Sequence, residues 1–542
     1  MVAVLALFTP LLLVASSWAT PLALPGLPRQ GAITVNTPVG QATGVVDGGA
    51  VRFTVRYATA NRWQPSVVAT TWTLPNGASD PAALPHACPQ DSSVENSQPT
   101  SEDCLSVILY VPPVAATKNV PTMLWIHGGS FIEGSATGPG LDGSKLAVAT
   151  GSIIAVVQYR LGVLGLFPPN GGTNLAVKDV INSLQFLRQT LPSFGGQTSK
   201  FTIAGQSSGA SMVRALLGTP SAQSLFRSAI LHSDPMDFGL LSTTTQSSLQ
   251  AAFTKSLNCS SSTPTTSAAA AAACYNALPL STILSAQDDL MSNAASIDPA
   301  AGLNEPIRPC LDGTLITSPL DSTHSYPSVN KPLIISTVLN EAGNAIYNYN
   351  AFPDPLPGSA FEPVVEATFG QPRTQQICSS TFYGVPTSGN LAIDVRPQIE
   401  KLGTDYIWKC SSWTFARNWI AHGGSAHVGM YVVGATYPSN ANVPFCASGG
   451  GICHEDDIML LFGTAPNPTS AQAAVTTEIQ ARYKNFLSAN DINPSGMATW
   501  APATTTDVHA RVLGGTGEAP VNACTPTFWG ATPQYDYQVF NE

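Results

Sequence analysis

The stretch Gly205-Gln206-Ser207-Ser208-Gly209 places a serine between two glycines in the pattern G-x-S-x-G. A β-type apolar run, residues 201–204, precedes it, and apolar residues at helical spacing follow it, at Met212, Val213, Leu216 and Leu217. This context predicts a strand, a tight turn and a helix, with Ser207 at the apex of the turn. A hydroxyl raised in this way could act as a nucleophile, but the pattern alone is weak because long Gly- and Ser-rich chains carry it by chance.

A serine nucleophile needs a base that takes its proton. Of the eight histidines, His454 follows the glycine-rich segment 449–453 at the start of a predicted helix. His427 is the second candidate, but it adjoins a predicted strand at 428–433, where a structural role is expected. On local context alone, His454 is thus the first candidate for the base and His427 the second.

The base needs a carboxylate that orients it. Glu341 lies just after a predicted strand, 333–337, and open α/β sheets build their sites at the carboxyl ends of strands. The acidic run 455–457 beside His454 could imitate a metal cluster. Its expected role is instead to stabilise the N-terminus of a helix. Neither a metal nor another cofactor is expected.

These residues must be positioned by a sheet. Apolar runs predict strands at 104–112, 120–126, 152–159, 201–204, 228–233, 333–337 and 426–433, and the spacing of apolar residues predicts a helix over 179–191. Alternating strands and helices indicate an α/β fold with a mainly parallel sheet that is covered on both faces. Residues 32–58 are expected to form an N-terminal meander, 75–103 a polar surface loop, and the alanine run 268–273 a surface helix within an insertion.

Composition narrows the possible partners. The 542 residues are 44% hydrophobic and 10% charged, with a net charge of −10 and no cluster of Lys or Arg. This balance argues against nucleic acid or anionic membranes as partners. Because no internal linker is visible, residues 20–542 are predicted to form one domain, and the oligomeric state is left open.

Residues 1–19 have the features of a signal peptide, with an apolar stretch at 2–15 and a cleavage site after Ala19. No later run is apolar over the roughly 18 residues of a membrane span, so an extracellular, secreted protein without a stable membrane anchor is expected. Ten cysteines would then form up to five disulfides. Proximity favours Cys88–Cys104, Cys259–Cys274 and Cys446–Cys453, and leaves the pairing of Cys310, Cys378, Cys410 and Cys524 open.

Several further segments occur in a familiar order: Ser101-Glu-Asp-Cys-Leu-Ser-Val-Ile-Leu-Tyr-Val-Pro112, Trp125-Ile-His-Gly-Gly-Ser-Phe131, Tyr159-Arg-Leu-Gly162, Phe194-Gly-Gly196 and the serine turn. With them the chain resembles the type-B carboxylesterase/lipase family, the cholinesterase-like α/β-hydrolases, of the secreted fungal type. The resemblance covers roughly residues 30–540. It implies the α/β-hydrolase fold, a central mostly parallel sheet with loop and helical insertions, and hydrolysis of a small-molecule carboxylic ester through an acyl-enzyme.

The resemblance also implies a role for particular residues. Ser207, Glu341 and His454 would form the catalytic triad, and the backbone N–H groups of Gly129, Ser130 and Ser208 would form the oxyanion hole. Ser233 resembles a buried family serine behind the triad, although an ordinary core hydroxyl is equally expected there.

This chain departs from the family pattern at four positions. Gln206 replaces the usual carboxylate before the nucleophile, and Ser208 replaces the usual small residue after it. Ser130 stands for the third glycine of the oxyanion loop, and Ala342 is inserted in the acid motif.

The loop between Cys88 and Cys104 bears on the substrate. Residues 89–103 contain no aromatic side chain that could face a quaternary ammonium, and they are too polar for an interfacial lid. The sequence thus favours an esterase for soluble or short-to-medium acyl esters. Two alternatives are a lipase or sterol esterase whose lid comes from residues 250–300, and a non-catalytic adhesion or binding module; the ordered triad argues against the second.

Overall fold

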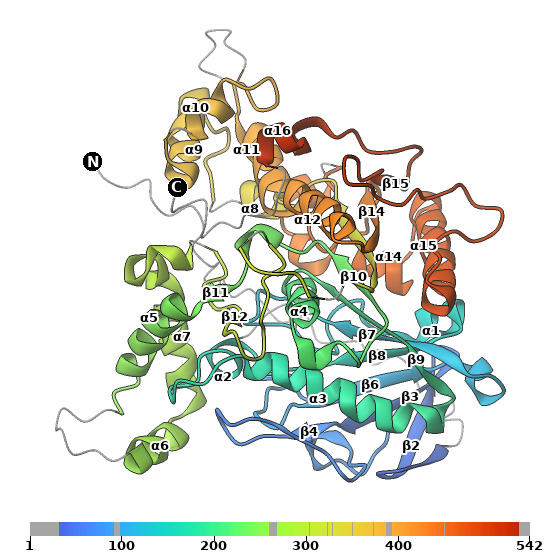
Figure 1. Ribbon diagram of the computed structural model, residues 1–542. Coiled ribbons are helices and arrows are strands. Elements are labelled where there is room, and N and C mark those ends of the chain that lie inside the picture. The colour runs from blue at the N-terminus through green and yellow to red at the C-terminus, as the bar shows by residue number, and fades with distance from the viewer. Residues whose placement is uncertain are drawn as a thin grey trace.

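The computed structural model describes residues 32–530, apart from 92–97, 260–267, 303, 322, 328, 349–350, 372, 386–392 and 449. The predicted signal peptide lies outside the described residues. The core element is an eleven-stranded sheet, drawn in Figure 1. Its strands in spatial order are β1 (Ile33–Thr37), β2 (Gly40–Asp47), β3 (Ala50–Arg56), β6 (Ser106–Val111), β8 (Ile153–Val157), β7 (Val120–Ile126), β9 (Gly196–Gln206), β10 (Ser228–His232), β13 (Pro332–Val338), β14 (Ser425–Tyr431) and β15 (Arg511–Leu513).

The sheet changes character along its width. The strands from β1 to β8 pair antiparallel, which includes the predicted N-terminal meander, and those from β8 to β15 pair parallel. The prediction of a mostly parallel sheet is confirmed. Since parallel strands end at the same edge, the residues that follow β9 and β13 emerge on one side, separated only by β10.

The central strands are apolar because both of their faces are covered. Every residue of β7, β8 and β10 is buried. Side chains alternate along β7: Leu124 and Ile126 belong to one hydrophobic cluster, Met123 and Trp125 to the other. The first cluster includes residues of α3 (Leu175–Thr190), α4 (Ser208–Leu217) and α12 (Cys410–Ala421), and the second includes residues of α1 (Ser144–Thr150), α14 (Ile458–Phe462) and α15 (Ser470–Ala489).

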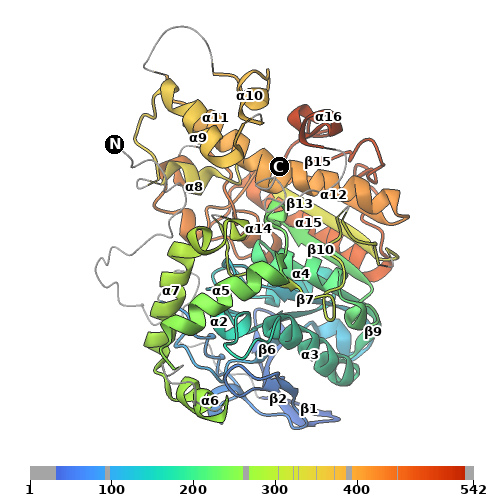
Figure 2. The same cartoon turned by 60° about the vertical axis from the view of Figure 1, so that its left-hand side comes forward.

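Two groups of helices extend from this body, as Figures 1 and 2 show. The first comprises α5 (Thr243–Ser256), α6 (Ala268–Ala277) and α7 (Leu280–Ile297). The second comprises α9 (Phe361–Phe369), α10 (Arg373–Cys378) and α11 (Arg396–Gly403), which surround a third hydrophobic cluster. The alanine run lies in α6, which confirms the predicted surface helix. Shorter helices are α2 (Gly162–Gly165), α8 (Gly343–Tyr347), α13 (Pro444–Ala447) and α16 (Pro526–Trp529).

Among the described residues, no single helix is long and apolar enough to cross a membrane. By length and composition only the pair Ala269–Ala277 and Leu280–Ile297, bent by 99°, meets that requirement together.

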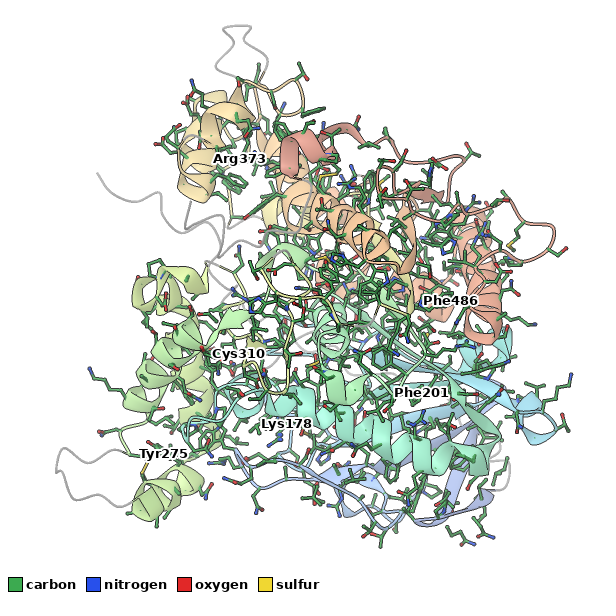
Figure 3. All side chains as sticks on the ribbon, in the orientation of Figure 1. Lys178, Phe201, Tyr275, Cys310, Arg373 and Phe486 are labelled. Carbon is green, nitrogen blue, oxygen red and sulfur yellow. A yellow bond between two sulfur atoms is a disulfide. The ribbon has the colours of Figure 1, made fainter. Side chains whose placement is uncertain are left out.

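Four disulfides cross-link the fold. The three predicted pairs are confirmed, and the fourth joins Cys410 at the start of α12 to Cys524. Cys310 and Cys378 carry free thiols, so a fifth disulfide does not form. Figure 3 places Cys310 in the body of the molecule and Arg373, on the helix of Cys378, at its top. The two thiols thus belong to different packed regions.

Candidate active site

Ser207 lies in the tight turn that the sequence predicts, directly between β9 and α4. Its backbone angles are φ 56° and ψ −129°, a conformation that side-chain-bearing residues rarely adopt. The backbone N–H of Ser207 donates to the carbonyl oxygen of His232 over 2.9 Å, which anchors the turn to β10. The neighbouring strand thus helps to hold a strained serine in place.

The two glycines of the turn are required by packing. A Cβ on Gly205 would lie 2.3 Å from the carbonyl oxygen of Gly209, and a Cβ on Gly209 would lie 2.1 Å from that of Ile126. Both separations are far below any van der Waals contact. Strand and helix can therefore pass this closely only without side chains at these positions.

His454 and Glu341 contact each other directly. The imidazole Nδ1 lies 2.6 Å from the Glu341 Oε2, and the Oε1 of this buried carboxylate accepts the backbone N–H of Val338 over 2.8 Å. Burial lowers the pKa of His454, but the hydrogen bond and the charge of Glu341 outweigh it, so that the pKa is raised overall. The structure thus brings two predicted site residues together from positions 113 residues apart.

The other imidazole nitrogen faces the serine turn. Nε2 of His454 lies 3.1 Å from Nε2 of Gln206, the fully buried residue that precedes Ser207. Within the described part of the chain, the Ser207 hydroxyl itself is not a hydrogen-bond partner of His454. The imidazole therefore lies at the turn and is held there by its neighbour.

The predicted oxyanion loop has an unusual backbone. Gly129, Ser130 and Phe131 all have positive φ, at 101°, 50° and 62°, and the N–H of Phe131 donates to the Ser208 Oγ over 3.1 Å. The N–H groups of Gly129 and Ser130 have no acceptor among the described residues. Ser208 begins α4, and first-turn N–H groups lack an intrahelical acceptor. None of the three predicted donors is thus satisfied by another described residue.

Glu305 is a residue that the sequence interpretation missed. Burial raises the pKa of its carboxyl to about 7, while a hydrogen bond from the Ser130 side chain and the charges of Arg308 and His454 act in the opposite direction. Part of the residue remains exposed. No sequence signal pointed to it, because a single glutamate between Asn304 and Pro306 has no pattern of its own.

The acidic run 455–457 lies directly before α14, at the helix N-terminus where it was predicted. Asp457 occupies the N-cap position of α14, but its side chain makes no cap hydrogen bond; it lies 2.7 Å from Nδ1 of the buried His232 instead. Asp456 accepts the backbone N–H of Cys453. The position of the run at the start of α14 agrees with the prediction, and its stabilising charge effect stays a prediction.

His427 and Ser233, the two weaker candidates for a role at the site, are both packed among other residues. His427 lies on β14 beside Trp500, and burial lowers its pKa to about 4. Ser233 is buried with φ 48°, and its hydroxyl has no hydrogen-bond partner in the described structure.

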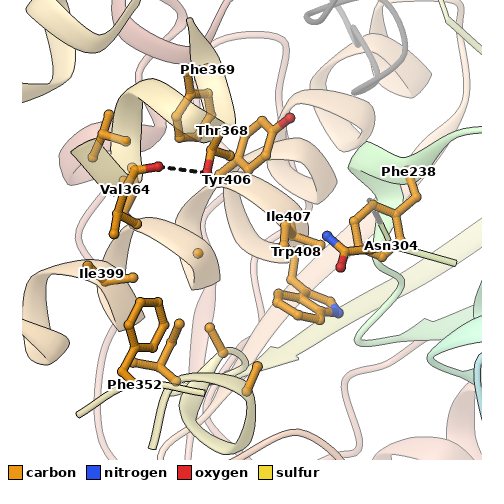
Figure 4. Close-up of a pocket in the computed structure, with 16 residues that line it drawn as sticks. Phe238, Asn304, Phe352, Val364, Thr368, Phe369, Ile399, Tyr406, Ile407 and Trp408 are labelled. Atoms are coloured by element: carbon orange, nitrogen blue, oxygen red, sulfur yellow. Dashed lines mark hydrogen bonds between the residues drawn. The ribbon is translucent and has the colours of Figure 1, made fainter. Parts of the chain in front are cut away.

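An apolar pocket adjoins the candidate triad (Figure 4). At one end lie Phe238, Asn304 and Trp408, whose ring centre is 5.4 Å from that of His454. Ala342, the residue after Glu341, also lines it. The remaining lining is mostly aliphatic and aromatic: Ala345, Ile346, Phe352, Val364, Val365, Thr368, Phe369, Ile399, Leu402, Gly403, Tyr406 and Ile407. An apolar group would therefore fit next to the imidazole.

A sequence model described as the carboxylesterase family matches residues 32–518. The chain belongs to the carboxylesterase family. This membership confirms the family to which the motifs pointed.

Individual relatives match over different lengths. A probable N-octanoylanthranilate hydrolase of Rhodococcus erythropolis is 34% identical over 218 residues, 38% of this chain and 47% of the relative. Para-nitrobenzyl esterase of Bacillus subtilis (strain 168) is 37% identical over 164 residues, 28% of this chain and 33% of the relative. The chain thus spans half or less of these two hydrolases. Crystal protein of Dictyostelium discoideum is 27% identical, over 76% of this chain and 74% of the relative.

A solved structure of PNB esterase shares the architecture. It superposes with a TM-score of 0.69 at 22% identity and covers 89% of this chain and 95% of its own. The α/β-hydrolase fold that the sequence predicted is thereby confirmed.

Proposed function

We propose that this member of the carboxylesterase family is a secreted serine carboxylic-ester hydrolase that works through an acyl-enzyme. The observation that carries the proposal is the contact of 2.6 Å between His454 and the buried Glu341, beside a serine held in a strained turn. Nucleophile, base and orienting carboxylate are the parts that acyl transfer needs.

In the first half-reaction the Ser207 Oγ attacks the ester carbonyl carbon, and its proton passes to Nε2 of His454. Glu341 stabilises the imidazolium. The former carbonyl oxygen, now negatively charged, accepts hydrogen bonds from the backbone N–H groups of Gly129, Ser130 and Ser208. The carbon–oxygen bond to the alcohol then breaks, and Nε2 returns the proton to the departing oxygen. An acyl-serine and a free alcohol result.

In the second half-reaction a water molecule takes the place of the alcohol. It gives a proton to Nε2 of His454 while its oxygen attacks the acyl carbon. The same N–H donors stabilise the second tetrahedral intermediate, and its collapse returns the proton to Ser207 and releases the carboxylic acid. No cofactor enters either half-reaction.

Labelling with a serine-directed organophosphate tests this proposal. The wild-type protein is expected to take up one equivalent at Ser207, whereas the Ser207→Ala variant takes up none. A folded wild-type protein that stays unlabelled would support the alternative of a non-catalytic binding or adhesion module.

The preferred substrates are soluble or short-to-medium acyl esters. The apolar pocket beside His454 supports a substrate with an apolar group, and the polar loop 89–103, of which 92–97 lie outside the described residues, argues against an interfacial lid. Hydrolysis of short and long acyl esters should be compared below and above their solubility limits. A sharp rise only above that limit would favour the lipase or sterol-esterase alternative, with a lid from the segment that folds as α5–α7.

Secretion and the fungal type of the sequence are further parts of the proposal. The four disulfides support an oxidising destination. Mass spectrometry of protein collected from culture medium is expected to find Thr20 as the first residue.

A further inference from the structure

Gln206 is the residue whose contact the proposed mechanism leaves unexplained. It ends β9, is fully buried, and directs its amide nitrogen at Nε2 of His454 over 3.1 Å. Nε2 is also the nitrogen that must receive the proton of Ser207. The side chain before the nucleophile therefore touches the reacting atom of the base.

The hydrogen bonds around the imidazole define where its proton lies. Nδ1 faces the carboxylate Oε2 of Glu341 at 2.6 Å, so Nδ1 carries the hydrogen. In the neutral ring Nε2 then has only a lone pair, and the amide N–H of Gln206 can donate to it. This is the tautomer that a general base needs before it accepts a proton from serine.

The amide is confined in this orientation. A Cβ on Gly128 would lie 2.7 Å from the Gln206 Oε1, so the oxyanion loop packs closely on that oxygen. Oε1 is buried and has no hydrogen-bond partner in the described structure. The amide thus has one protein partner, the imidazole.

The neutrality of this side chain also matters. Glu341 on the loop after β13, Asp457 before α14, and Glu305 on the loop preceding β12 (Cys310–Leu311) already raise the pKa of His454 through their charges. Trp408 contributes only an uncharged ring to the same surroundings. A further carboxylate in contact with Nε2 would stabilise the imidazolium and leave less free base at a given pH.

We propose that Gln206 is a positioning residue: in the resting site its amide N–H holds Nε2 of His454 and maintains the neutral Nδ1–H imidazole without adding a charge. Because Nε2 has one lone pair, this hydrogen bond breaks when the Ser207 hydroxyl donates to Nε2 in its place. This inference rests on the proposed function for its kinetic consequences, whereas the tautomer can be measured without any ester.

The first test is NMR spectroscopy of the full-length protein with ¹⁵N-labelled histidine, in which the signals lost in His454→Gln identify His454. At neutral pH the wild-type spectrum is expected to show a protonated Nδ1 and an unprotonated Nε2. A protonated Nε2 in the neutral ring would overturn the proposal. This readout is independent of catalysis, so it separates failure of the proposal from failure of the assigned function.

The second test compares Gln206→Glu with Gln206→Met, which has a similar shape but no amide. In Gln206→Glu the pKa of His454 and the acid limb of kcat/KM against pH are expected to rise together by about one unit or more. In Gln206→Met kcat is expected to fall about tenfold or more, with KM changed less. That limb should move up by less than in Gln206→Glu, because only the donor that stabilises the neutral ring is lost. An unshifted pKa in Gln206→Glu, or full kcat in Gln206→Met, would overturn the proposal, and if Gln206→Glu does not fold, Gln206→Met decides alone.

Discussion

The Glu341 carboxylate has a defined partner for each oxygen. One accepts the N–H of Val338, and the other accepts from the imidazole of His454. A carboxylate with both oxygens hydrogen-bonded can orient the imidazole and stabilise its charged form, which is the role of the acid in a serine triad.

Replacing this acid by an amide should separate charge from shape. For Glu341→Gln we expect kcat to fall by on the order of 10⁴-fold with a much smaller change in KM, because the amide can hold the wrong tautomer. The acid limb of kcat/KM should move to lower pH, since the carboxylate that raises the pKa of His454 is gone. Rate profiles against pH measure both effects. The exposed Glu362→Gln serves as the control, and activity within tenfold of wild type would remove Glu341 from the triad.

Glu305 predicts a pH-dependent choice of substrate. Burial raises the pKa of its carboxyl to about 7, and its charge acts on His454. We therefore expect it to repel an anionic acyl group bound beside His454 more strongly above that pH than below it. In Glu305→Gln, kcat/KM for such an anionic ester should rise about tenfold at about pH 8.5 and little at about pH 5.5. A neutral ester of equal length is the control. A gain of equal size at both pH values would contradict a role for this charge.

The sequence located some site residues much better than others. The candidate Ser207 lies in a G-x-S-x-G pattern, and the candidates Glu341 and His454 were assigned by their place in the motifs of the family. Glu305, on a loop, and Trp408, in a helical turn, reach the site only because distant segments converge on it, and neither has a local signal. The contact of Gln206 with His454 joins positions 248 residues apart and likewise depends on the assembled sheet.

At the scale of elements, the loop that carries Glu341 is braced by a helix. The N–H of Ala342 donates to the Thr404 hydroxyl over 3.0 Å, and this hydroxyl donates to the Glu400 Oε1 over 2.8 Å. Thr404 begins a π-helical segment, Thr404–Lys409, which continues α11 and contains Trp408. The irregular turn thus serves both the acid loop and the pocket.

This brace predicts a pH-dependent stability. Burial raises the pKa of Glu400 from its ordinary 4.5 to about 7, so the folded state resists ionisation, and unfolding releases a proton between these values. The contribution of the neutral carboxyl is therefore full below about pH 4.5 and is lost as the pH rises through about 7. Glu400→Gln should be more stable than wild type by up to about 3 kcal/mol at about pH 8 and equal near pH 4. Urea unfolding at the two pH values measures this, and a difference independent of pH would contradict it.

Elements with strong local patterns were predicted well. The buried strands β7, β8, β9 and β10 appear as apolar runs, and α3 has clear helical spacing. β15, only Arg511–Leu513, and the π-helical segment lack such patterns, because a neighbouring strand or helix determines them rather than their own residues. Tertiary packing, not propensity, decides these short elements.

At the scale of the whole molecule, two disulfides should differ in what they contribute to stability and to activity. The Cys410–Cys524 bond closes a separation of 114 residues, and the Cys446–Cys453 bond closes 7. From loop entropy, removing the first by Cys410→Ala with Cys524→Ala should cost about 5 kcal/mol, and removing the second by Cys446→Ala with Cys453→Ala about 2.5 kcal/mol. The second pair adjoins His454, so its loss should reduce kcat the more. Denaturant unfolding and rate measurements on both double variants test this, and equal losses of kcat would contradict the assignment.

The single continuous sheet also predicts how the chain unfolds. We propose that residues 20–542 form one domain, because the same sheet joins strands from both ends of the described chain. Calorimetry is then expected to show one cooperative transition at neutral pH. Two separable transitions would show instead that the chain has more than one domain.

The sheet order has a consequence for changing this scaffold. The serine and the acid emerge from β9 and β13 on either side of β10, whereas most of the pocket wall comes from insertions beyond the strand ends. Under the proposed function, the reacting groups would thus lie on the sheet, and most of the pocket wall would lie outside it, with Ala342 and Trp408 at the boundary. A library that varies the segment from Phe352 to Ile399 can redesign what is cleaved while the reacting atoms stay in register.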